Sequence, residues 1–197
     1  METLSDIFAH VCGQNHCFAA GGVDLPVCQR CLGLYVAAAL TAAWLAATGI
    51  RRRGLPSWGV FLVHEAALLA ALLAGVHVWA WGASPVGKLT CGLWTGHVAI
   101  LWLIGGAGHL WRLSRPAPRA QLPWRTGDKV QAAAAPLVLA GLAQLIPHAM
   151  SLGWGFWSAV VVAGALALAA AVAAAAAAII AYVLALLRRR GCAPVRA

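Results

Sequence analysis

The chain contains five long apolar segments, each close to the length that a helix needs to cross a bilayer. A span needs about 20 mainly apolar residues, because the hydrocarbon core is about 30 Å thick. Backbone polar groups find no water in that core, so segments that cross it must be helical. The sequence therefore predicts an all-α, polytopic membrane bundle. Its expected spans are residues 31–50, 58–81, 89–111, 130–150 and 157–187.

Composition agrees with a membrane protein and argues against a soluble one. Charged residues make up 10% of the chain and hydrophobic residues 62%, whereas soluble domains contain about 25% charged residues. The formal net charge of +9 does not indicate nucleic acid, because the basic residues stand in short runs between the apolar segments. Glu2 and Asp6 precede any apolar core, which argues against a cleavable signal peptide. We expect a single membrane domain over residues 1–197, with residues 1–30 as a Cys-rich head.

The basic residues also predict an orientation. Twelve of the 14 Lys and Arg residues fall after the first, third and fifth apolar segments, and only Arg30 and Lys88 fall on the other side. The positive-inside rule then places the C-terminus in the cytoplasm and the N-terminus outside a plasma (inner) membrane. The basic loop over residues 112–129 is expected to lie against anionic lipid headgroups.

The head carries the residues with the clearest chemical potential. Its thiols and imidazole are Cys12, His16, Cys17, Cys28 and Cys31. Two residues separate Cys28 from Cys31, a spacing that lets both sulfurs reach one metal ion or close a small disulfide ring. The expected orientation puts all five residues at the outer face of the membrane. Cys91 begins the third apolar segment at the same face.

Three interpretations of this cluster remain open. The thiolates, with His16, bind Zn²⁺ in a structural or catalytic site. Alternatively, Cys28 and Cys31 exchange electrons, with Cys12 and Cys17 as a relay and a membrane quinone as acceptor. In the third interpretation, the cysteines form ordinary disulfides in an oxidising compartment.

A second group of polar residues lies inside the apolar segments. Glu65 follows His64 in the second segment, and His97 and His109 lie in the third. An acid within a membrane helix is costly, and so it marks a candidate functional site. His109 is a candidate partner for Glu65. These residues support a lower-ranked hypothesis, that the protein transports a small solute or couples transport to protons.

Small residues predict close helix packing in the third segment. Gly92 and Gly96 form a small-xxx-small pattern, and residues 105–108 add a second thin patch. Such patterns let two helix backbones approach closely in a membrane.

The head resembles the signature of the bacterial and archaeal membrane proteins called domain of unknown function 2085. The similar stretches are Cys12-Gly-Gln14, Pro26-Val-Cys28-Gln-Arg30-Cys31-Leu-Gly33-Leu-Tyr35 and Lys88-Leu-Thr-Cys91-Gly92. The family's His after the first Cys is Gly13 here, Lys88 replaces Arg, and Cys91 replaces Thr. The resemblance implies a small polytopic membrane protein with an N-terminal Cys motif, without an assigned activity.

The family pattern marks a core set of Cys12, Cys28 and Cys31 within the head. Cys17 or His16 would complete a four-ligand site. A zinc-binding site at the outer face is therefore the leading functional hypothesis. Thiol–disulfide exchange by Cys28 and Cys31 is the main alternative, and protein partners are not indicated.

Overall fold

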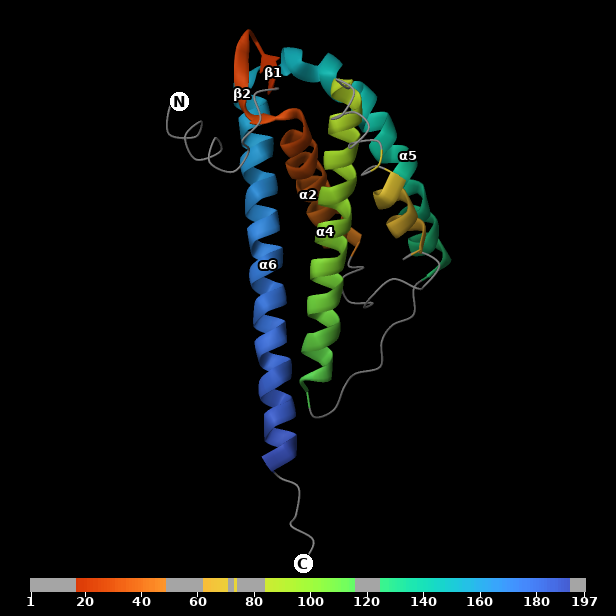
Figure 1. Ribbon diagram of the computed structural model, residues 1–197, viewed down its shortest axis with the longest axis vertical. Coiled ribbons are helices and arrows are strands. Elements are labelled where there is room, and N and C mark those ends of the chain that lie inside the picture. Colours follow the sequence, from red (N-terminus) through yellow and green to blue (C-terminus); the bar gives the residue numbers. More distant parts are fainter. Residues whose placement is uncertain (1–16, 49–61, 71–72, 74–83, 116–124, 192–197) are drawn as a thin grey trace, which may run out of the picture.

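The computed structural model describes residues 17–48, 62–70, 73, 84–115 and 125–191. Within these residues the protein is a helical bundle with a short hairpin at one end (Figure 1). Cys12 and His16 lie outside the described residues.

The hairpin corrects the purely helical expectation. Strands β1 (Cys17–Ala20) and β2 (Val23–Cys28) pair antiparallel, with a bulge between Cys17 and Ala19. Gly21 and Gly22 connect them with φ of 62° and 81°, a conformation that two-residue hairpin turns require and that glycine adopts without strain. Alternating burial in β2 turns Leu25 and Val27 inward. The prediction missed this period-two pattern because the cysteines alone defined the head.

Within the described residues, four helices are long and apolar enough to cross a membrane. They are α2 (Gln29–Thr48), α4 (Pro85–Leu113), α5 (Thr126–His148), which continues through the 3₁₀ turn η2 (Ala149–Leu152), and α6 (Trp154–Gly191). They correspond to the first, third, fourth and fifth predicted spans. The second predicted span, residues 58–81, is described only at residues 62–70 and 73, which are helical. A total of five spans stays a prediction.

The helix ends differ from the predicted ends by a few residues. α4 begins at Pro85 rather than at residue 89, because proline fits the first turn of a helix, where its missing N–H costs nothing. The predicted basic loop, residues 112–129, is shorter than expected, because α4 continues through Leu113 and α5 begins at Thr126. Gly153, with φ of 86°, ends η2 and leads into α6.

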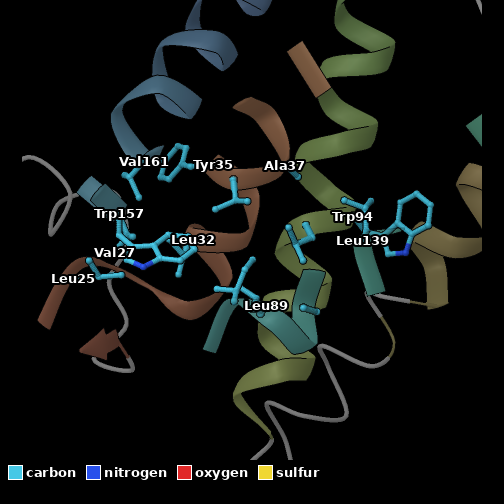
Figure 2. Close-up of a cluster of buried hydrophobic side chains, with 14 of the residues drawn as sticks. Leu25, Val27, Leu32, Tyr35, Ala37, Leu89, Trp94, Leu139, Trp157 and Val161 are labelled. Carbon is cyan, nitrogen blue, oxygen red and sulfur yellow. The ribbon is translucent and has the colours of Figure 1, made fainter. Parts of the chain in front are cut away.

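Helices α2, α4 and α6 form the centre of the bundle, and all three begin at the hairpin end (Figure 1). Figure 2 shows side chains from the hairpin and from these helices gathered in one buried cluster, with Leu139 of α5 at its edge. Its buried members include Leu25, Val27, Leu32, Leu89, Leu93, Trp157 and Val161. The hairpin is thereby fixed to the bundle by burial of apolar side chains.

Glycines allow α2 and α4 to cross in backbone contact. A Cβ atom on Gly92 would overlap the carbonyl oxygen of Arg30, and one on Gly96 would overlap the carbonyl oxygen of Leu34. Gly33 faces α4 in the same way, with Leu93 N at 2.8 Å from its would-be Cβ. The predicted small-residue contact of Gly92 and Gly96 is confirmed.

The second predicted patch behaves differently at Gly106. A Cβ atom there would meet nothing within 4 Å. Gly106 therefore faces open space, and at this position the predicted close contact was wrong.

The outer surfaces of α5 and α6 are apolar. Leu137 is 77% exposed and Leu166 is 65% exposed, and large exposed hydrophobic side chains recur along both helices. Soluble monomers rarely carry contiguous apolar patches larger than a few hundred Å². Lipid tails are the environment that such a surface suits.

Candidate functional site

Cys28 lies where the hairpin joins the first helix. It is the last residue of β2 and directly precedes Gln29, the first residue of α2. The backbone N–H of Cys31 donates a hydrogen bond to Cys28 Sγ, with an N–S distance of 3.5 Å. Cys28 thus occupies the capping position, where a side-chain acceptor satisfies an N–H of the first helical turn.

The hairpin brings a third thiol to the same place. Cys17 and Cys28 are Cα partners across the two strands, so their side chains start within about 5 Å of one another. Cys28 is buried, whereas Cys17 and Cys31 are half-buried. We call the three residues Cys17, Cys28 and Cys31 the hairpin corner.

The hairpin corner contains only part of the predicted ligand set. Among residues 17–48, 62–70, 73, 84–115 and 125–191, no group of three or more His, Cys, Asp or Glu side chains is placed so that it could hold a metal ion. Cys12 and His16, the other predicted ligands, lie outside those ranges. The zinc and redox hypotheses therefore stay predictions.

Cys91 lies close to the hairpin corner, although it is about 60 residues away in the sequence. It is buried at the start of α4, beside the contact of Gly92 with the Arg30 carbonyl. The Arg30 guanidinium lies within electrostatic range of the Cys91 thiol. The two stretches that resemble the family signature, around Arg30 and around Gly92, therefore form one contact between α2 and α4.

A second site lies deep in the bundle, where two histidines meet. The Nε2 atoms of His64 and His97 are 3.1 Å apart, and Nδ1 of His97 is 2.9 Å from Thr41 Oγ1. All three side chains are buried. We call His64 and His97 the imidazole pair.

The imidazole pair lies near the middle of the membrane-spanning helices. Thr41 lies 12 residues after Gln29, and His97 lies 12 residues after Pro85, so each is about 18 Å from its helix start. The contact brings His64 to the same depth. The sequence identified both histidines as candidates, but it predicted neither their contact nor the hydrogen bond with Thr41.

Aromatic rings and a groove surround the imidazole pair. Trp94 lies edge-on to both imidazoles, with ring centroids 5.7 Å from His64 and 5.8 Å from His97. Trp44 lies 6.4 Å from His97. A groove of about 590 Å³ opens between α2, α4 and α5, and Thr41 and His97 line it together with apolar side chains.

Two other residues of the predicted intramembrane site do not join the pair. Glu65 is half-buried and lines a shallow, otherwise apolar pocket with Leu62 and Leu69. His109 lies 12 residues beyond His97 on α4, which separates them by about 18 Å. The structure therefore brings together only half of the predicted set, and the transport hypothesis stays a prediction.

The long apolar helices and their exposed hydrophobic surfaces define the chain as a polytopic α-helical membrane protein. Residues 12–105 match the family described as "Predicted membrane protein (DUF2085)", the family that the motifs of the head resemble. The match covers the hairpin corner, the imidazole pair and the contact between α2 and α4. A search of curated proteins and a search of solved structures found no match.

Proposed function

We propose that the protein holds a transition-metal ion, most simply Zn²⁺, at the hairpin corner on the outer face of the plasma membrane. The observation that carries the proposal is the hydrogen bond from the Cys31 N–H to Cys28 Sγ. An N–H donor directed at sulfur stabilises a thiolate, which is the form that binds a metal. Cys28 and Cys31 would supply two ligands to the ion.

The remaining ligands would come from the head. Cys17 starts opposite Cys28 in the hairpin, and Cys12 and His16 precede it in the sequence. Four such ligands would close a tetrahedral structural site, whereas three would leave a position for water in a catalytic one. Either site would tie the head to α2 at the outer end of the bundle.

The proposed orientation of the protein in the membrane rests on its basic residues. Basic residues lie at the far ends of α4 and α6, with Arg112 in the last turn of α4 and Arg188 near the end of α6. The positive-inside rule would place those ends in the cytoplasm, next to anionic lipid headgroups, and the hairpin outside.

Metal content of the purified full-length protein tests the proposal. We expect the zinc content of Cys28→Ser and of Cys31→Ser to be about one ion per chain lower than that of the wild type. Cys192→Ser is the matched control, because Cys192 belongs to the tail beyond α6, and it should retain the metal. Metal-free wild-type protein, or head variants that both hold as much zinc as the wild type, would contradict the proposal.

The second candidate is thiol–disulfide exchange by Cys28 and Cys31, with a quinone as the electron acceptor. Two thiols at the start of a 20-residue helix favour it, because the field at a helix N-terminus stabilises a thiolate. Oxidation of the dithiol to a disulfide would release two electrons and two protons, which would convert the quinone to the quinol.

The two candidates differ in what purified protein should contain. If Cys28 and Cys31 exchange electrons, added quinone should form a disulfide between them. Replacement of Cys28 by Ser should then trap a mixed disulfide. Half-buried Cys31 would be the attacking thiol in that trap. If added quinone forms no disulfide and no mixed disulfide accumulates, the redox candidate is wrong.

A further inference from the structure

The two nitrogens of the imidazole pair converge on one point inside the bundle. His64 Nε2 and His97 Nε2 are 3.1 Å apart, and the two ring planes differ by 22°. The rings come from separate helical segments, residues 62–70 and α4. Because the two rings approach each other through their Nε2 atoms, both nitrogens border the same small volume.

This separation suits two ligands of a single metal ion. Imidazole nitrogens bind zinc at about 2.0–2.1 Å, and two nitrogens 3.1 Å apart at that distance subtend about 98° at the ion. That angle lies between the octahedral and tetrahedral values of about 90° and 109°. An ion could therefore contact both nitrogens with little movement of either helix.

Thr41 supplies the outer contact that metal-binding histidines commonly have. When His97 Nδ1–H donates to Thr41 Oγ1, across 2.9 Å, the lone pair of His97 lies on Nε2 and faces His64. A hydrogen bond at the other ring nitrogen in this way fixes the tautomer and orientation of a metal-ligating histidine. In the metal-free protein, His64 Nε2–H would donate to His97 Nε2. Metal binding would then require the His64 proton to move to Nδ1, with no net change in protons.

We propose that His64 and His97 form a transition-metal site in the membrane interior, separate from the hairpin corner. Imidazole ligands favour Co²⁺, Ni²⁺, Cu²⁺ and Zn²⁺ over Mg²⁺ and Ca²⁺. No third His, Cys, Asp or Glu of the described residues joins the pair. The remaining positions would be taken by water or by a small exogenous ligand, for which the adjoining groove lined by Thr41 and His97 has room.

Co²⁺ is the probe that separates this site from the hairpin corner. Co²⁺ bound by thiolates shows a strong sulfur-to-metal charge-transfer band, whereas Co²⁺ bound by nitrogen and oxygen shows only weak ligand-field bands. Full-length protein in lipid nanodiscs would be titrated with Co²⁺ after chelator treatment. We expect one equivalent that shows ligand-field bands without the charge-transfer band.

Substitutions then identify the residues that bind this equivalent of Co²⁺. His64→Gln and His97→Gln should each weaken the binding at least ten-fold, while His109→Gln, on the same helix as His97, should leave it unchanged. Thr41→Val keeps the side-chain shape and should weaken binding about ten-fold, because it removes only the outer hydrogen bond. Protection of buried Cys28 from maleimide would show that each variant is folded.

Three outcomes would overturn the proposal. Co²⁺ spectra that contain only the thiolate species would show that the imidazole pair is a structural hydrogen bond. Nitrogen-bound Co²⁺ that persists in both Gln variants of the pair would place the ion elsewhere. Equal weakening by His109→Gln would indicate that histidines outside this pair bind the ion.

Discussion

The hairpin corner and the imidazole pair differ in how the chain assembles them. The hairpin corner lies within fifteen consecutive residues, from Cys17 to Cys31, and a two-residue turn joins its strands. The imidazole pair joins His64 and His97, which are 33 residues apart, and depends on helix packing. Residues that are close in the sequence therefore form the hairpin corner, whereas the packing of distant helical segments forms the imidazole pair. Substitutions that act on one site alone, or on both, test this distinction.

The largest expected effect comes from the contact that serves both sites. Gly92 faces the carbonyl of Arg30, beside Cys31, and lies five residues before His97 on α4. Gly92→Ala should separate α2 from α4 and lower the free energy of unfolding by about 3 kcal/mol or more, because the added Cβ meets backbone that cannot move aside. Thermal unfolding in detergent measures the change.

A matched glycine on the same helix provides the control. A Cβ at Gly106 meets nothing within 4 Å, so Gly106→Ala should be neutral or slightly stabilising, because alanine favours helix by about 1 kcal/mol over glycine. In Gly92→Ala, labelling of Cys28 by maleimide and of His97 by diethyl pyrocarbonate should both rise. Equal stabilities for the two variants would contradict the close crossing of α2 and α4.

The difference between the sites also explains how far the sequence alone could lead. Four of the spans were predictable because about twenty consecutive apolar residues can cross a membrane only as a helix. Cys28 and Cys31 were identifiable because their spacing is local. The contact of His64 with His97 was not, because it depends on the position of residues 62–70 against α4, which no local pattern specifies.

Thr41 illustrates the same limit in a single residue. Threonine in an apolar helix commonly bonds its hydroxyl to the carbonyl four residues earlier, as Thr48, Thr90 and Thr95 do here. Thr41 contacts His97 instead. Only the neighbouring helix distinguishes it from the other three, and so the sequence offered no signal for its role.

The imidazole pair should be separable from the hairpin corner by one substitution. His97→Phe removes the partner of His64 Nε2 and of Thr41 Oγ1. Loss of two hydrogen bonds between buried polar groups should lower the free energy of unfolding by about 1–3 kcal/mol. Half-buried His109 is the control, and His109→Phe should change stability by less. Thermal unfolding of the two variants measures the difference.

The hairpin corner should not respond to that change. In His97→Phe, protection of Cys28 from maleimide should match the wild type, while His64 should become accessible to diethyl pyrocarbonate. Loss of Cys28 protection in this variant would mean that the two sites are one cooperative unit.

The smallest expected effect acts on the hairpin corner alone. Gly22 has φ of 81°, and a Cβ there would meet nothing within 4 Å. Gly22→Ala therefore tests backbone conformation without a clash, and should cost about 1 kcal/mol. Because the turn sets the pairing of Cys17 with Cys28, maleimide should label Cys28 faster, and diethyl pyrocarbonate labelling of His64 and His97 should stay unchanged.

Gly155→Ala is the control, since Gly155 lies in α6 and is equally open. Unchanged Cys28 labelling in Gly22→Ala would show that burial of Leu25 and Val27 against the bundle, rather than the turn, holds the corner together.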